Sequence, residues 1–212
     1  LMGSTETSLA FASMGFISPK GRCHTFDNDG DGYIRSEGVG AVFLIPKSRI
    51  IDETITPWAY IVGTATNQDG STATLTAPNG ISQQNVINDA LSDGKLTPDK
   101  VGYLECHGTG TPLGDPIEVG AIVSTYGKAS RPLHIGSVKS NIGHTEIAAG
   151  MAGIFSLIMT LNHQYIPPLC GFKNMNRLIE EKIKGKSIMI GGDSKIDTEY
   201  GGVSSFGFGG TN

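Results

Sequence analysis

The sequence predicts an α/β domain with mixed sheets. Short apolar runs typical of buried strands alternate with segments whose apolar residues recur at helical spacing. Glycine-rich loops stand where strands pass into helices, which is where ligand sites of such folds lie. With 212 residues, 38% of them hydrophobic and 17% charged, the chain is long and apolar enough to form a hydrophobic core.

Two strands and a helix are expected in the first half of the chain. Residues 38–46 form an apolar run that ends at proline, and residues 58–66 form a second strand. Residues 82–91 carry apolar side chains at helical spacing, and Gly94 would end this helix.

The second half continues the alternation. Residues 101–106 form a strand that runs into a loop of glycines and threonines. Asp115 and Pro116 then cap and open a helix that reaches Tyr126, and residues 133–138 form the next strand.

The last third begins with a long apolar helix over residues 147–161. Its length of about 15 residues falls short of the roughly 20 that a membrane span needs, so we expect a buried core helix. Residues 187–190 and 200–206 form a final strand pair that closes on the glycine-rich residues 207–210.

Charge and cysteine content narrow the function classes. The net charge is −4 and no block of Lys and Arg is present, which disfavours nucleic acid as a partner. Cys23, Cys106 and Cys170 share no metal-ligand spacing, and a reduced, cytoplasmic compartment fits them best. The first residues resemble no signal peptide.

A short acidic segment resembles the start of a calcium-binding EF-hand loop. Asp27, Asp29 and Asp31 occupy the first, third and fifth positions of the pattern, but its twelfth position is Gly38. Glu37 stands one residue too early to serve as the bidentate ligand. We therefore expect a turn with solvated carboxylates and no metal site.

Three loops carry residues suited to chemistry. The first begins with His107 at the end of a predicted strand, and Thr109 and Thr111 alternate with glycines that allow close approach to the backbone. A histidine that only caps a turn is the alternative for this loop alone.

The second loop runs from Lys139 to Glu146, again between a strand and a helix. His144 lies just before the helix, where the positive end of the helix dipole favours a neutral imidazole that donates a hydrogen bond. An ion pair between Lys139 and Glu146 would fix the loop, which would also suit a purely structural role.

The third loop, residues 205–212, is a glycine-rich turn around Phe208 at the end of the chain. Such turns expose backbone N–H groups that can form an oxyanion hole.

Taken together, the three loops resemble the β-ketoacyl synthase family. The motifs are His-Gly-Thr-Gly-Thr from His107, Lys-Ser-Asn-Ile-Gly-His from Lys139, and Gly-Phe-Gly-Gly-Thr-Asn around Phe208. Thr-Asn-Gln-Asp-Gly over residues 66–70 makes the chain similar to ketosynthase domains of type I polyketide synthases more than to discrete fatty-acid enzymes. The resemblance covers essentially all 212 residues.

The resemblance implies a thiolase-like layered αβαβα fold. The chain would be a partial ketosynthase domain over residues 1–212, with residues 1–50 ending the N-terminal half and residues 51–212 forming the C-terminal half. It also implies an acyltransferase that performs a decarboxylative Claisen condensation. A malonyl-type extender on an acyl carrier protein would react with an enzyme-bound acyl thioester and give a 3-oxoacyl-carrier product.

The resemblance also assigns roles to residues and partners. His107 and His144 would assist decarboxylation, while Lys139 and Glu146 orient and tune them. No cofactor is expected, since substrates ride on the phosphopantetheine of the carrier protein. The implied partners are that carrier, neighbouring synthase domains and a second copy in a homodimer.

Two further roles follow from the same resemblance. Thr109 and Thr111 would hydrogen-bond the phosphopantetheine arm, and the backbone at Phe208 would complete the oxyanion hole.

The nucleophile of the family is expected to be absent from these residues. In the family it lies in a Cys-Ser-Ser-like elbow upstream of the segment that matches Leu1, and none of the three cysteines has that context. A non-catalytic ketosynthase-like scaffold or chain-length partner that binds a carrier protein is the alternative. The histidines and Lys139 argue against it. A thiolase acting on coenzyme A thioesters shares the fold but carries a different histidine arrangement.

We therefore predict that the 212-residue chain alone forms no acyl-enzyme and catalyses no condensation. Cys106 is the cysteine nearest the predicted site, but alternation along a strand turns it away from the pocket that His107 enters. Intact-mass spectrometry after incubation with an acyl thioester tests this. A stoichiometric acyl adduct on Cys106 would contradict it.

Overall fold

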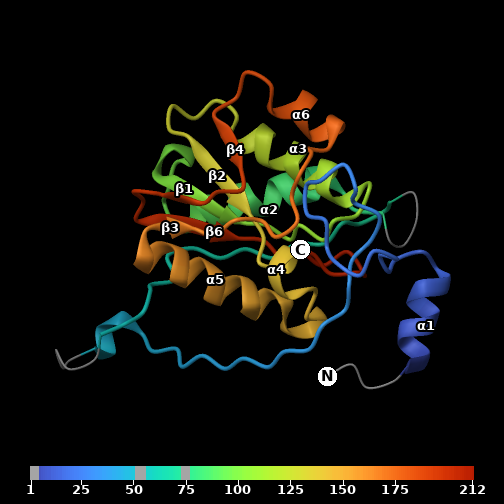
Figure 1. Ribbon diagram of the computed structural model, residues 1–212. Coiled ribbons are helices and arrows are strands. Elements are labelled where there is room, and N and C mark those ends of the chain that lie inside the picture. The colour runs from blue at the N-terminus through green and yellow to red at the C-terminus, as the bar shows by residue number, and fades with distance from the viewer. Residues whose placement is uncertain (1–4, 51–55, 73–76) are drawn as a thin grey trace.

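A parallel four-stranded sheet forms the centre of the computed structural model, which describes residues 5–50, 56–72 and 77–212 (Figure 1). The strand order is β4-β2-β1-β6. These strands are β1 (Val101–Glu105), β2 (Leu133–Gly136), β4 (Ile188–Ile190) and β6 (Tyr200–Val203). A small antiparallel sheet pairs β3 (Tyr165–Ile166) with β5 (Ser194–Lys195). The predicted α/β class with mixed sheets is confirmed.

Helices cover both faces of the sheet, with α2 and α3 on one side and α5 on the other (Figure 1). The helices are α1 (Thr5–Ser13), α2 (Gly80–Asp93), α3 (Gly114–Tyr126), α4 (Lys139–Ile142), α5 (Ala149–His163) and α6 (Arg177–Ile183). Short 3-10 turns span Lys47–Arg49, Pro98–Lys100 and Glu146–Ala148. In α2, the Asn79 side chain accepts hydrogen bonds from the first-turn N–H groups, as the residue type favours.

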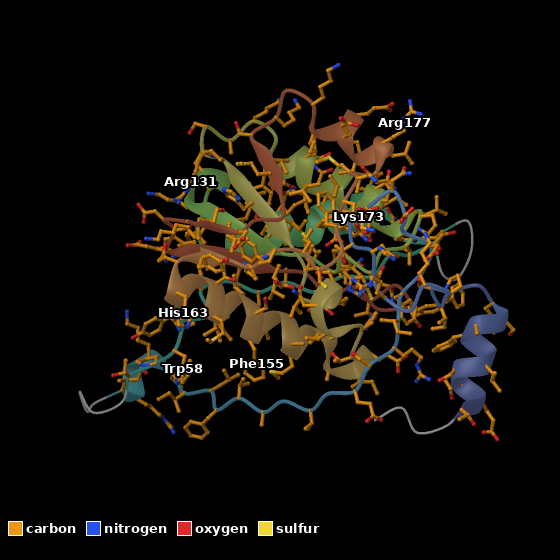
Figure 2. All side chains as sticks on the ribbon, viewed as in Figure 1. Trp58, Arg131, Phe155, His163, Lys173 and Arg177 are labelled. Atoms are coloured by element: carbon orange, nitrogen blue, oxygen red, sulfur yellow. The ribbon has the colours of Figure 1, made fainter. Side chains whose placement is uncertain are left out.

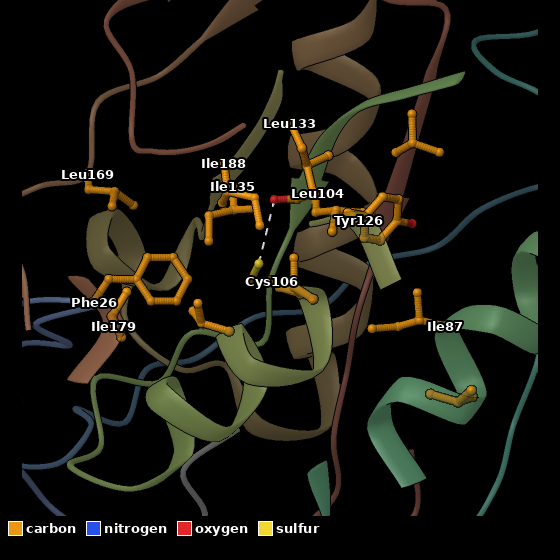
Figure 3. Close-up of a cluster of buried hydrophobic side chains, with 14 residues drawn as sticks. Phe26, Ile87, Leu104, Cys106, Tyr126, Leu133, Ile135, Leu169, Ile179 and Ile188 are labelled. Carbon is orange, nitrogen blue, oxygen red and sulfur yellow. Dashed lines mark hydrogen bonds between the residues drawn. The ribbon is translucent and has the colours of Figure 1, made fainter. Parts of the chain in front are cut away.

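The alternation of side chains along β1 divides the core into two parts. Leu104 and Cys106 join the larger cluster toward α2 and α3 (Figure 3), whereas Tyr103 packs with Leu157 of α5 and Ile166. The larger cluster includes Phe26, Val119, Ile122, Leu133, Ile135 and Ile179. Because both faces of β1 are covered, the strand is buried along its whole length.

The strands predicted over residues 38–46 and 58–66 are wrong. Both segments are extended, but the structure pairs neither with a strand among the described residues. Figure 1 shows residues 38–46 running along the outer side of α5. Without a hydrogen-bonded neighbour they present apolar side chains to solvent, and Val39 is 98% exposed.

The predicted final strand pair is also wrong in its pairing. Residues 188–190 and 200–203 are strands, but β4 and β6 lie at opposite edges of the sheet, separated by β2 and β1. Parallel pairing explains this, since consecutive parallel strands need a crossover and do not form a hairpin.

The apolar helix predicted over residues 147–161 is present as α5 but is only partly buried. Its Gly153 and Thr160 face the protein, while Phe155 is 40% exposed and points away from the sheet, on the side of Trp58 (Figure 2). In the described ranges no helix combines the length and apolar character needed to cross a membrane.

In the acidic segment at residues 27–31, Asp27 and Asp31 accept hydrogen bonds from different groups, while Lys20 pairs with both Asp29 and Asp31 at 3.5 and 3.4 Å. Asp27 is buried and accepts from the backbone N–H groups of Asp29, Lys173 and Asn174 at 2.6–2.9 Å. Asp31 accepts from the Ser18 hydroxyl. The segment is therefore a turn in which Asp27 fastens a distant loop.

Replacing Asp27 with Ala is expected to lower the free energy of unfolding by about 3 kcal/mol, since it leaves three backbone donors without their acceptor. Asp29→Ala, at a largely exposed side chain, should change it by less than about 0.5 kcal/mol. Urea unfolding at neutral pH measures both. Equal stability of the two variants would contradict this role of Asp27.

Candidate active site

His107 lies two residues after the end of β1, and a buried carboxylate fixes its backbone. Glu118 of α3 accepts hydrogen bonds from the backbone N–H of His107 at 2.7 Å and of Gly108 at 2.9 Å. Two N–H groups at a strand exit would otherwise be buried without partners. The Glu118 carboxylate therefore fixes the backbone turn after β1 and the position from which the His107 side chain extends.

The glycines of this loop are required by its geometry. Gly108 and Gly110 have φ of +46° and +77°, a region that L residues with side chains rarely adopt. A Cβ on Gly108 would lie 2.7 Å from Cβ of Ser137, and one on Gly110 would lie 2.7 Å from the backbone nitrogen of His24. The backbone of the His107 loop thus packs directly against Ser137 and His24, with no room for side chains at the two glycines.

Asp115 does not cap α3 as predicted. The helix begins at Gly114, and the preceding Leu113 makes no side-chain capping bond. The Asp115 carboxylate instead accepts from the backbone N–H of Gly110 at 3.0 Å and of Phe26 at 2.8 Å. Because the Asp115 carboxylate accepts from both backbone segments, it links the His107 loop to the segment around residue 26.

His144 is held at the other side of the site by an extended backbone pairing. Its N–H donates to the Ile34 carbonyl at 2.8 Å, and its carbonyl accepts from Ser36 at 2.9 Å. Gly143 before it has a φ of +80°, which ends the short helix α4 and redirects the chain.

The two imidazoles lie together, as a shared role in decarboxylation requires. Their ring centroids are 5.5 Å apart and the ring planes meet at 84°. Nδ1 of His144 accepts from the backbone N–H of Glu146 at 2.9 Å, and Nδ1 of His107 faces the N–H of Phe206 at 3.4 Å. An Nδ1 that accepts must be unprotonated, so in each neutral ring Nε2 carries the hydrogen.

Burial and a buried cation keep both rings neutral. Burial, and next the Lys139 ammonium, lower the pKa of His144 to about 4. Burial first, then Lys139 and His144, hold the pKa of His107 well below its ordinary value. Neutral imidazoles with Nε2–H groups are hydrogen-bond donors across the neutral pH range.

The predicted ion pair between Lys139 and Glu146 is wrong. Glu146 is paired with Arg35, whose Nε and Nη2 lie 2.5 and 2.9 Å from the two carboxylate oxygens. This bidentate pair lowers the pKa of Glu146. Lys139 is 3% exposed; burial lowers its pKa, and Glu105 and then Glu118 oppose that effect.

The two threonines of the first loop lie side by side. Their Oγ1 atoms are 3.3 Å apart, and that of Thr111 also accepts from the Gly114 N–H at 3.2 Å. Their role toward a carrier arm stays a prediction.

The Phe208 side chain does not contact the histidines. It stacks on Phe11 at 6.0 Å between ring centroids and meets Phe16 edge-on at 4.9 Å. Phe206 is the aromatic ring beside His107, at 5.6 Å. The two aromatic rings, on either side of Gly207, thus have different neighbours. The predicted oxyanion role concerns the Phe208 backbone and stays a prediction.

The environments of Cys106 and Cys23 do not favour a nucleophile. Cys106 is buried on the α3 side of β1, with Sγ 3.8 Å from the Leu104 carbonyl (Figure 3), and burial raises its pKa well above the ordinary value. Burial also raises the pKa of Cys23. The prediction that Cys106 points away from the His107 pocket is confirmed by its place in the core.

Sequence reasoning missed Arg35, Glu118 and Phe206. Glu118 carried a signal, since it stands three residues after Asp115 and therefore on the same face of an otherwise apolar helix. Two carboxylates on a buried helix face need hydrogen-bond donors, and backbone N–H groups of the loop before α3 supply them. Arg35 lies 111 positions from Glu146, and no local pattern joins them.

The neutral state of His144 predicts a pH dependence of stability. Its pKa in the folded protein, about 4, lies below the ordinary 6.5, so the unfolded chain binds more protons between these values. This group therefore destabilises the fold as pH falls from about 6.5 toward 4. In His144→Gln, the loss of unfolding free energy between pH 7 and pH 5 should be smaller by about 2 kcal/mol, since about 1.4 kcal/mol per pH unit accrues over the roughly 1.5 units below 6.5. Urea unfolding at both pH values measures it; an unchanged loss would contradict a neutral His144.

Comparison with known proteins agrees with the motifs. The family model described as "Beta-ketoacyl synthase, C-terminal domain" matches residues 58–173, and that of the N-terminal domain matches residues 1–49. The ketosynthase from module 6 of the bacillaene synthase from Bacillus subtilis 168 superposes with a TM-score of 0.92 at 34% identity. That match covers 100% of this chain and 39% of the solved one.

Curated relatives are much longer. A phenolphthiocerol/phthiocerol polyketide synthase of Mycobacterium tuberculosis is 42% identical over 211 residues, 98% of this chain and 14% of that protein. The highly reducing polyketide synthase virA of Hypocrea virens is 39% identical over 214 residues, 100% of this chain and 9% of that protein. The chain thus has the thiolase-like fold of ketosynthase domains and belongs to the β-ketoacyl synthase family of the polyketide synthases.

Proposed function

We propose that the ketosynthase domain that contains this chain catalyses decarboxylative Claisen condensation. A malonyl-type extender on an acyl carrier protein reacts with an acyl thioester of the enzyme and gives a 3-oxoacyl-carrier product. Membership of a condensing-enzyme family supports the reaction class. The observation that carries the proposal is the pair of neutral imidazoles, each with Nδ1 facing a backbone N–H and Nε2–H left to donate.

Decarboxylation is the step that this pair serves. The carbon–carbon bond to the malonyl carboxylate breaks, carbon dioxide leaves, and the electron pair moves onto the thioester as an enolate. His107 and His144 donate hydrogen bonds to the thioester oxygen, where the negative charge develops. Because both rings are neutral, they stabilise the enolate without protonating it. The Lys139 ammonium helps to keep both rings neutral, and the Arg35–Glu146 pair positions the backbone N–H that donates to Nδ1 of His144.

Carbon–carbon bond formation follows. The enolate carbon attacks the carbonyl of the acyl thioester on a nucleophilic cysteine, and the tetrahedral oxyanion accepts a hydrogen bond from the Phe208 backbone. The oxyanion then collapses, and the cysteine leaves as thiolate. In this proposal Cys23, Cys106 and Cys170 are not the nucleophile, which lies outside these 212 residues.

The partners in this proposal are carrier proteins and neighbouring synthase domains, with a second copy in a homodimer. Thr109 and Thr111 hydrogen-bond the phosphopantetheine arm beside the histidine loop. The chemistry needs no cofactor, since the leaving carboxylate supplies the electron pair.

Replacing either histidine in the complete domain tests the proposal. His107→Ala and His144→Ala are each expected to lower malonyl-carrier decarboxylation by about 100- to 1000-fold, since each removes one donor to the enolate oxygen. Release of labelled carbon dioxide measures the step. Acylation of the nucleophilic cysteine, measured by intact mass, should persist because it does not pass through the enolate.

His163→Ala is the matched control, because this histidine is exposed at the end of α5 and should leave both steps unchanged. Decarboxylation that survives in both active-site variants would contradict the proposal. A wild-type domain that binds the carrier but releases no carbon dioxide would favour a non-catalytic scaffold.

A further inference from the structure

Glu105 is a buried acid with no role in the mechanism above. It ends β1 two residues before His107 and is 1% exposed. Its Oε1 accepts from the backbone N–H of Val138 at 2.6 Å, and Oε2 accepts from the hydroxyls of Ser156 at 2.8 Å and Tyr103 at 3.0 Å. Donors from β1 itself, from α5 and from the residue before α4 therefore meet at one side chain.

The bond to Val138 connects the two loops of the site. Val138 immediately precedes Lys139 and α4, the turn that leads to His144. Glu105 belongs to the strand that delivers His107. A single carboxylate thus spans the distance between the strand end and the start of the second loop, where no other described side chain of β1 donates to or accepts from the backbone of residues 138–144.

The helix α5 is shaped to admit this carboxylate. A Cβ built on Gly153 would lie 3.4 Å from Cγ of Glu105 and 2.9 Å from Cγ2 of Val203, so a side chain there would crowd the site. One turn further along, Ser156 points its hydroxyl at Oε2. The Glu105 carboxylate therefore binds α5 as well as the backbone before Lys139.

Lys139 and Glu105 are both buried, and Glu105 binds the backbone one residue before Lys139. Burial raises the pKa of Glu105, and among the acids Glu105 acts most strongly to raise the pKa of Lys139. A cation taken out of water needs compensating negative charge nearby. The titratable groups that act on Lys139 are Glu105 of β1, Asp115 and Glu118 of α3, His107, His144, Cys23 and Cys106. Both oxygens of Glu118 and both of Asp115 already hold the His107 loop or Phe26.

We propose that Glu105 is a positioning residue of the active site. Its carboxylate ties the Lys139 turn to the strand that carries His107, and it supplies negative charge that keeps Lys139 as an ammonium. The inference rests on the proposed function and adds to it the residue that sets the distance and charge between the two histidine loops.

Glu105→Gln in the complete ketosynthase domain separates charge from shape. The amide oxygen can still accept from Val138, while the charge is lost. We expect malonyl-carrier decarboxylation to fall about tenfold at pH 8. Removing a nearby negative charge lowers the pKa of Lys139, so the basic limb of the decarboxylation profile should move to lower pH by about one unit.

Asp27→Asn is the matched control. Asp27 is also a buried carboxylate that accepts from backbone N–H groups, but it holds the loop at Lys173 and Asn174. This variant should lose stability and leave the basic limb where it is. A shift of equal size in Asp27→Asn would overturn the inference, because loosened packing would then explain both.

Glu105→Asp keeps the negative charge and tests whether the side chain must be long enough to accept from the Val138 N–H. The shorter side chain should withdraw from Val138, so decarboxylation should fall about tenfold while the basic limb stays in place. This variant decides the matter if Glu105→Gln does not fold. Wild-type rates in Glu105→Asp, or a wild-type profile in Glu105→Gln, would overturn the inference. A wild-type domain without decarboxylation would instead overturn the proposed function.

Discussion

The site depends on one interaction above all: the Glu118 carboxylate accepts hydrogen bonds from two backbone N–H groups of the His107 loop. A strand that ends in the middle of a parallel sheet delivers its last backbone donors into a buried region. Glu118 satisfies those of His107 and Gly108, and Asp115 satisfies that of Gly110. Both acids are near the start of α3, so the helix that covers the sheet also sets the loop. The imidazole of His107 is therefore positioned by backbone and not by contacts of its own ring alone.

Buried charge explains why the histidines are donors. Lys139 is enclosed together with carboxylates whose pKa values burial raises: Glu118 to about 7 and Asp115 to about 6. A single cation among partly protonated acids disfavours a second cation nearby. Protonation of His107 or His144 would add that second cation, so both rings stay neutral. Arg35 acts in a different way. It pairs with the Glu146 side chain, and the backbone N–H of Glu146 donates to Nδ1 of His144.

Much of this arrangement could be predicted from the sequence, and the exceptions have physical causes. The strand–loop–helix units containing His107 and His144 follow from apolar runs interrupted by glycines, which are local signals. The expected pairing of Lys139 with Glu146 used proximity in sequence, but Glu146 has a φ of +51° and turns toward Arg35. The extended segments 38–46 and 58–66 have strand-like composition, yet a strand exists only with a hydrogen-bonded neighbour.

The described part of this chain supplies hydrogen-bond contacts to both imidazoles and to both histidine loops. Nδ1 of each ring faces a backbone N–H, and each loop is fastened by a carboxylate: Glu118 beneath His107, and Glu105 before Lys139. None of these contacts passes through a cysteine thiol. Within the described residues, the geometry of the histidine pair thus rests on backbone N–H groups and buried carboxylates.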